Sequence, residues 1–115
     1  MEAIAKSKYI KGSPQKARLV IDLIRGKKVE EALSILRFSH KKFSRSIEKV
    51  LRSAISNAEQ KSATLEVEKL YVKEAHVDSG PTKNRKRLRP VPMGRAHYQM
   101  RRLSHITVRV SDGQD

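Results

Sequence analysis

The side chains best placed for acid–base or metal chemistry in this chain are one pair of carboxylates and four histidines. Glu66 and Glu68 stand two positions apart, so on a strand they would share one face and could serve as a general acid and base. Lys69 and Lys73 follow closely, and we interpret the group as a solvated strand face. The histidines lack the spacing of metal ligands, and no HExxH motif occurs: His40, His76, His97 and His105. We predict no metal site.

The sequence also lacks the pattern of an activated nucleophile or of a nucleotide-binding loop. Ser13 precedes Lys16, but its setting is that of a helix cap. The run Gly80-Pro81-Thr82-Lys83 holds a glycine and a lysine without the spacing of a P-loop. The chain has no cysteine, which excludes disulfides and thiolate chemistry. We therefore predict that the protein is not an enzyme and uses no cofactor.

Positive charge dominates the composition. The 115 residues include 26 Lys and Arg against 12 Asp and Glu, a formal net charge of +14. This balance favours a polyanionic partner, of which nucleic acid is the commonest. The longest nearly apolar run, residues 19–24, contains Asp22 and is too short to cross a bilayer. The first residues lack the apolar core of a secretory signal, so we expect a cytoplasmic protein with no membrane partner.

Much of the capacity to bind phosphate lies near the C-terminus, where no Asp or Glu occurs from Ser79 to Ser111. Arginine predominates in this stretch, and its planar guanidinium matches phosphate groups. Tyr98 is the only aromatic residue among the charges, so we expect recognition of RNA shape and phosphate and not of base sequence. The cations are Lys83, Arg85, Lys86, Arg87, Arg89, Arg95, Arg101, Arg102 and Arg109.

A second basic cluster surrounds the expected start of the first helix: Lys6, Lys8, Lys11, Lys16 and Arg18. Cations oppose the helix dipole at that end, a cost that is reasonable if an anion binds there. Simple surface charge is the alternative interpretation. Further along, Asp22 is spaced to pair with Arg18 and Arg25, either to orient both arginines or as purely structural helix pairs.

Helical periodicity covers the first half of the chain. Ser13 as N-cap and Pro14 at the first helical position predict a helix that Gly26 closes. A second helix is expected over residues 29–37, and a third from near Ser39 to near Gln60. Each has an apolar stripe along one side, which predicts that all three pack on a common core.

Strand patterns occur at the N-terminus and in the second half of the chain. Alternation weakly predicts a strand over residues 3–9, a long strand over 65–77 and a last strand over 106–110. The long strand changes phase between Val67 and Leu70 and again between Val72 and Ala75, where we expect a bulge or bend. In the last strand, Thr107 is expected to point outward.

The two long strands bracket the basic segment, which predicts an antiparallel hairpin with a protruding end. A disordered basic tail is the alternative, but the strand pattern resumes after the segment. We therefore predict an α+β fold of three helices packed on a small antiparallel three-stranded sheet, with a long protruding β-hairpin. It forms a single domain over 1–115, with a globular body of about 1–79 and 104–112 and an extended basic hairpin of about 80–103.

Six blocks, in order along nearly the whole chain, indicate a family. They read SPQKARLV at 13–20, DLIRGK at 22–27, KVLRSAISNAE at 49–59, VDSGPT at 77–82, MGRA at 93–96 and SHITV at 104–108. These blocks resemble the bacterial-type large-subunit ribosomal protein 22 family. The resemblance implies a body on the outer face of the large subunit near the polypeptide exit. It also implies a hairpin that reaches the wall of the nascent-chain tunnel.

The resemblance further implies which partners and residues are involved. The expected partners are large-subunit ribosomal RNA, neighbouring large-subunit proteins and the nascent polypeptide, with a role in assembly and no homo-oligomer. The resemblance and the basic clusters described above together give the expected RNA contacts: Lys8, Lys11, Ser13, Lys16, Arg18, Arg25, Lys83, Arg85, Lys86, Arg87, Arg89, Arg95, Arg101, Arg102 and His105. The expected tunnel-lining tip comprises Val91, Pro92, Met93, Gly94 and Arg95.

A small DNA-binding protein is the alternative that the residues leave open. The two short helices on either side of Gly26 could form a helix-turn-helix. However, residues 29–37 offer a DNA groove little beyond Arg37, and the long acid-free arm would have no role.

Overall fold

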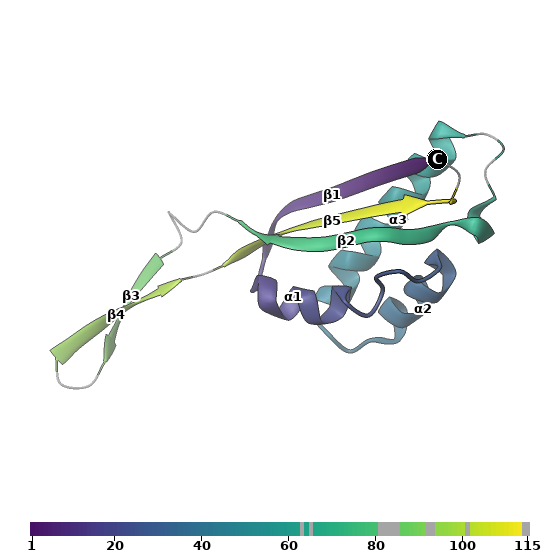
Figure 1. The fold of residues 1–115 in the computed structure, drawn as a ribbon. Coiled ribbons are helices and arrows are strands. Elements are labelled where there is room, and N and C mark those ends of the chain that lie inside the picture. Colours follow the sequence, from purple (N-terminus) through teal and green to yellow (C-terminus); the bar gives the residue numbers. More distant parts are fainter. Residues whose placement is uncertain (63, 65, 81–85, 92–93, 101, 114–115) are drawn as a thin grey trace.

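The structure, a computed structural model, describes residues 1–62, 64, 66–80, 86–91, 94–100 and 102–113. Three helices lie on one side of a three-stranded antiparallel sheet of order β1-β5-β2, and a two-stranded ribbon, β3-β4, projects from its end (Figure 1). The molecule measures 65 × 26 × 18 Å. The elements are β1 (Glu2–Lys11), α1 (Pro14–Ile21), α2 (Val29–Phe38), α3 (Phe43–Lys61), the 3-10 helix η1 (Val67–Lys69), β2 (Tyr71–Ser79), β3 (Lys86–Val91), β4 (Arg95–Met100) and β5 (Leu103–Ser111).

This arrangement confirms the predicted fold class of three helices on a small antiparallel sheet. β5 is the central strand and pairs antiparallel with both β1 and β2. Because β2 enters the hairpin and β5 returns from it, the ribbon continues the two body strands outward (Figure 1). The division into body and hairpin segments stays a prediction.

The core lies between the sheet and the long helix α3. Ile47, Leu51 and Ala54 form a buried stripe on α3, and Ile106 and Val108 are fully buried on β5. At i, i+4, i+7 spacing the helix residues fall on one face, which packs on the sheet. The buried residues of β1 in this layer are alanines at positions 3 and 5, and their small size lets α3 lie close to the strand.

Three predicted boundaries are wrong, each for a local reason. α1 ends at Ile21, and i→i+3 hydrogen bonds then lead through a turn to Gly26, whose N–H donates to Val72 O at 3.0 Å and not to the helix. α3 begins at Phe43, four residues after the predicted start at Ser39. The long strand predicted from 65 begins only at Tyr71, because residues 67–69 form the 3-10 turn η1.

The sheet confirms one predicted irregularity and shows that one residue on its outer face is covered by its neighbours. The register between β2 and β5 shifts between Val72 and Glu74, where the pattern predicted a bulge. Thr107 alternates with the core residues Ile106 and Val108, as the outward prediction requires, but it is only 7% exposed. It lies on the central strand between Lys6 and His76 of the two neighbouring strands, and long side chains on both sides cover a threonine there.

Helix side chains cap the outer edges of the sheet. On β1, Asn57 Nδ2 donates to Ile4 O and Lys61 Nζ donates to Glu2 O, both at 2.9 Å. Residues four apart on a helix rise about 6 Å, close to the spacing of about 7 Å between alternate outward carbonyls of a strand. The helix and strand spacings match, so one face of α3 satisfies two edge carbonyls.

At the opposite edge of the sheet, arginine side chains donate to backbone carbonyls of β2. Arg18 donates from Nε and Nη2 to Val77 O at 3.2 and 3.0 Å. Arg25 donates from Nε and Nη2 to Ala75 O at 3.0 and 2.9 Å. Edge carbonyls are sites for unwanted strand pairing, and on β2 these guanidinium groups cover them.

Candidate nucleic-acid interface

The base of the hairpin is held together by backbone and hydroxyl hydrogen bonds. Gly12 N–H donates to Arg102 O at 3.0 Å, and Gly80 N–H donates to Leu103 O at 2.7 Å. Ser104 Oγ donates to Gly12 O at 3.0 Å. These contacts join the end of β1, the end of β2 and the start of β5. Segments far apart in the sequence thus meet where the hairpin leaves the body, and we call this region around Gly12, Gly80 and residues 102–104 the platform.

A polar pocket of about 250 Å³ opens at this platform, beside the start of α1. It is lined by Ser13, Pro14, Gln15, Arg18, Ser79 and Arg102. Ser13 has the predicted N-cap backbone conformation, with φ −77° and ψ 129°. Its hydroxyl makes no capping hydrogen bond within the described residues. The pocket therefore presents a hydroxyl and two guanidinium-bearing residues next to a helix N-terminus, a combination suited to phosphate.

Exposed cations extend the positive surface on both sides of the pocket. Lys8 and Lys11 are exposed on the last residues of β1, Lys16 is exposed on the first turn of α1, and Arg102 is exposed at the returning arm. The structure thus brings together, at the hairpin base, cations that the sequence separates by about 90 residues. Summed positive charge in one place attracts a polyanion more strongly than the same charges dispersed.

Arg25 occupies a different environment from these cations. Besides its two bonds to Ala75 O, its Nη1 lies 2.8 Å from Asp22 Oδ1. The predicted pairing of Asp22 is confirmed for Arg25, while Arg18 donates to Val77 O. Arg25 thus uses several of its donors inside the body, and its assignment as an RNA contact stays a prediction.

The ribbon of the hairpin carries the other predicted contacts. β3 and β4 pair in antiparallel register from Lys86 opposite Met100 to Val91 opposite Arg95. Gly94 has φ +73° in the connection between them, so the turn falls within the predicted tip. Arg87 and Arg89 lie on β3. Five predicted residues lie outside the described residues: Lys83, Arg85, Pro92, Met93 and Arg101.

His105 lies at the platform in contact with a residue that the sequence analysis missed. Tyr9 N–H donates to His105 Nδ1 at 3.1 Å, and the two rings meet edge to face with centroids 5.0 Å apart. Tyr9 is 61% exposed and has φ +61°. An aromatic residue between lysines, in a chain with 4% aromatics, was the available signal.

The open face of the sheet differs from the hairpin base because its charges are matched. Glu2 pairs with Lys73 and Arg109, and Glu74 lies 3.4 Å from Arg109 Nη1 and 3.6 Å from His76 Nδ1. The hydrogen bond from Lys73 lowers the pKa of Glu2 below its ordinary value, helped by the nearby positive charges. A face whose cations already have carboxylate partners attracts phosphate weakly.

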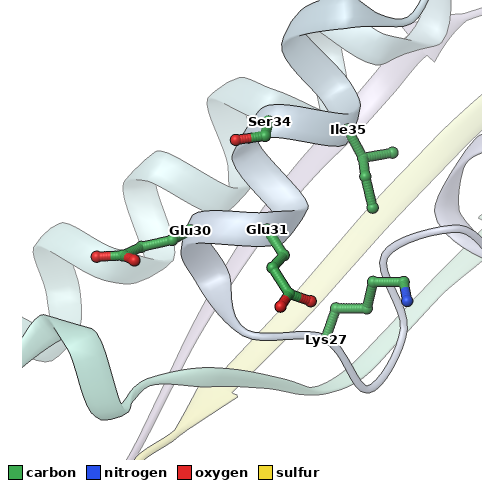
Figure 2. Close-up of a pocket in the computed structure, with 5 residues that line it drawn as sticks. All are labelled: Lys27, Glu30, Glu31, Ser34 and Ile35. Carbon is green, nitrogen blue, oxygen red and sulfur yellow. The ribbon is translucent and has the colours of Figure 1, made fainter.

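A groove beside α2 is also poorly suited to nucleic acid. It encloses about 510 Å³, and Figure 2 shows Glu31, Ile35 and Lys27 on one side of the helix with Glu30 and Ser34 on the other. The two glutamates lie in the first turn of α2, where they stabilise the helix dipole. The same carboxylates repel phosphate, so this groove is not part of the candidate interface.

The arrangement of α1 and α2 does not favour the DNA-binding alternative. The segment between them pairs with the β2 edge, with Lys28 opposite Tyr71. α1 packs against β2, whereas α2 packs against α3. A helix-turn-helix needs its two helices joined by a tight turn, with the second presented to the groove, and the first turn of α2 carries two acidic residues, Glu30 and Glu31.

Two other kinds of site were sought in the described residues. No helix there is long and apolar enough to cross a membrane. No group of three or more histidine, aspartate or glutamate side chains in the same part of the chain could hold a metal ion.

The whole sequence is similar to proteins of one family. It matches the family described as Ribosomal protein L22p/L17e over residues 5–111. It is 56% identical over 115 residues to "Large ribosomal subunit protein uL22" of Carboxydothermus hydrogenoformans, covering 100% of this chain and 99% of the relative. The protein of the same name from Halothermothrix orenii is 54% identical with the same coverage. That of Solibacter usitatus is 48% identical over 112 residues, 97% of each chain. The similarity spans body and hairpin alike.

Proposed function

The chain belongs to the ribosomal protein L22p/L17e family, and on that basis we propose that it binds large-subunit ribosomal RNA through the base and arms of its hairpin. The family is a structural, non-enzymatic component of the large ribosomal subunit, and this chain is such a constituent, located in the cytoplasm within the ribosome. The proposal concerns how it is held there and what its projecting ribbon reaches.

The observation that carries the proposal is the cationic platform at the hairpin base. Arg18 and Arg102 line the polar pocket beside Ser13, whose hydroxyl makes no capping hydrogen bond within the described residues, and Lys16 is exposed on the first turn of α1. Phosphate oxygens that enter the pocket would find charged and neutral donors already positioned. Binding therefore needs little rearrangement of the body, while the acid-free arm adds further phosphate contacts along the ribbon.

The shape of the molecule supports a second element of the proposal. The ribbon projects from one end of a molecule 65 Å long (Figure 1). Like charges along the arm repel one another unless phosphates neutralise them. We propose that ribosomal RNA surrounds the arms and that the tip, Val91 to Arg95, reaches the nascent-chain tunnel. The partners are then ribosomal RNA, neighbouring large-subunit proteins and the nascent polypeptide, with the chain present as a single copy.

The RNA part of the proposal is tested by a salt titration of binding. The dissociation constant of the full chain for purified large-subunit ribosomal RNA is measured at several salt concentrations, for the wild type and for Lys16→Gln. Removal of one cation that binds a phosphate should reduce the slope of log affinity against log salt by about 1. Lys69→Gln is the matched control, because Lys69 lies on η1 at the far end of β2 and is already 3.3 Å from Glu66.

The expected result is a shallower slope for Lys16→Gln and an unchanged slope for Lys69→Gln. Equal slopes for all three proteins would contradict the placement of the interface at the hairpin base. Wild-type binding with no salt dependence would contradict phosphate recognition altogether.

The tunnel part of the proposal is tested at the tip. Replacing Met93 by Arg should change the density at the tunnel wall in large subunits that contain the variant, or change their response to drugs that bind the tunnel, while affinity for ribosomal RNA stays near the wild-type value. Variant subunits with an unaltered tunnel would contradict the tip assignment.

A further inference from the structure

We propose that the ring of Tyr9 stacks with an unpaired nucleobase of the ribosomal RNA and that His105 holds Tyr9 in position. This inference rests on the proposed function and extends it, because it adds contact with a base to the recognition of phosphate and shape. It starts from the backbone of Tyr9, where the structure shows an unusual conformation.

Tyr9 adopts a conformation that a large side chain rarely takes. Its φ is +61°, and it is the one described residue other than glycine with positive φ. The strand register shifts between Ser7 and Ile10, so Tyr9 sits in a bulge of β1. Glycine or asparagine takes such a backbone conformation with less strain. A strained residue of this kind persists when something other than local backbone preference selects it.

Packing in the body does not account for the tyrosine. Its side chain is 61% exposed, so the core gains little from its ring. Its described ring contact is the edge-to-face pair with His105, whose planes meet at 89°. Edge-to-face geometry leaves an aromatic face of Tyr9 open to the surroundings. The body thus holds a strained residue in order to present an aromatic surface, and aromatic surfaces on RNA-binding proteins stack with unpaired bases.

His105 fixes the position of that surface. Its Nδ1 accepts the Tyr9 N–H at 3.1 Å, which in the neutral ring leaves the proton on Nε2. A Cβ built on Gly80 would lie 3.3 Å from His105 Cε1, so the imidazole lies close to the Gly80 backbone on the platform. The tyrosine is therefore held by a support that is itself half-buried in the body.

The charges around Tyr9 bring a nucleic-acid strand to it. Lys8 and Lys11 are exposed on the same strand. The polar pocket that Ser13 and Arg102 line lies at the platform, where Gly12 N–H donates to Arg102 O. A backbone bound at these cations would place its bases within reach of the Tyr9 ring, which is the combination of basic groove and aromatic surface that unpaired nucleotides favour.

The test compares three variants of the full chain in binding to purified large-subunit ribosomal RNA. Tyr9→Asn keeps a residue that tolerates positive φ and removes the ring, Tyr9→Phe keeps the ring, and Phe38→Ala removes another exposed aromatic, on α2. Stacking of one base predicts that Tyr9→Asn weakens binding about 5- to 150-fold, with an unchanged salt slope because every cation that binds phosphate is still present. Tyr9→Phe and Phe38→Ala should bind like the wild type.

Thermal unfolding separates stacking from a structural role. Tyr9→Gly relieves the backbone strain, so its midpoint should equal or exceed the wild-type value while its RNA affinity falls as for Tyr9→Asn. Loss of stability in both variants would overturn the inference, as would wild-type affinity of Tyr9→Asn or equal weakening by Tyr9→Phe. Those outcomes leave the proposed function intact, whereas wild-type binding without salt dependence would contradict the proposed function itself.

Discussion

Arginine has two roles in this protein: it donates hydrogen bonds to the edge of the sheet, and it lines the polar pocket. Arg18 and Arg25 have the charge expected of RNA contacts, yet both guanidinium groups donate to carbonyls of β2. Arg18 nevertheless lines the polar pocket together with Arg102, and both residues are exposed. Residue type predicted a cluster of positive charge, but it could not show which arginines also donate hydrogen bonds to the edge of the sheet.

Arg25 gives a direct test of this distinction. Arg25→Leu removes two hydrogen bonds to Ala75 O and the pair with Asp22, so the free energy of unfolding should fall by about 1 kcal/mol or more. The salt slope of RNA binding should change less than for Lys16→Gln. Arg52→Leu, which removes only a surface pair with Glu48 on α3, should cost less than about 0.5 kcal/mol. Unchanged stability of Arg25→Leu with a reduced salt slope would contradict the structural role.

Gly12 is a second residue whose importance depends on the fold. Its φ is +140°, and a Cβ there would lie 2.2 Å from Phe43 Cζ, a buried ring. Gly12→Ala should therefore lower the free energy of unfolding by about 1–3 kcal/mol through overpacking. Gly26→Ala is the matched control, because Gly26 has φ +79° with nothing within 4 Å of its Cβ position. Urea unfolding should show the larger loss at Gly12, and equal losses would mean that backbone strain alone matters.

At the scale of elements, the apolar stripes predicted the existence of the helices and strands better than they predicted the residues at which these begin and end. The three helices and the inward residues of β5 follow from periodicity, since burial of one face is a local property of the sequence. The strand predicted from residue 65 begins only at Tyr71, because residues 67–69 form a 3-10 turn. Such a turn and a strand with a phase change give the same apolar spacing in the sequence. Ile24 is fully buried although α1 ends at Ile21, so the apolar spacing continues past the end of the helix.

The capping of the sheet edges had no sequence signal, because the partners are far apart in the chain. Asn57 and Lys61 meet carbonyls of residues near the N-terminus. We expect the double variant Asn57→Leu, Lys61→Met to expose the β1 edge and to self-associate in sedimentation experiments, as open edges do. Gln60→Ala, on the same helix and exposed, should remain monomeric. A monomeric double variant of unchanged stability would show that the edge needs no capping.

At the scale of the whole molecule, charge and shape divide the protein into two ends. At one end, carboxylates pair with the cations on the open face of the sheet, and two more lie in the first turn of α2. At the other end lies the hairpin, which belongs to a stretch from Ser79 to Ser111 without any acidic residue. Composition predicted the polyanionic partner, and the strand patterns predicted the projecting ribbon. The platform itself could not be predicted, because it joins residues near 12, 80 and 103 through backbone hydrogen bonds that leave no local pattern.

The most direct test of the account is whether the arm anchors the chain in the large subunit. Residues 83–101 are replaced by a short Gly-Ser linker, folding of the body is checked by circular dichroism, and the variant is followed on sucrose gradients of cell lysate beside the wild type. Because the arm contributes many phosphate contacts, the wild type should sediment with large subunits while the folded variant stays near the top of the gradient. A folded variant that sediments with large subunits at wild-type occupancy would contradict the account.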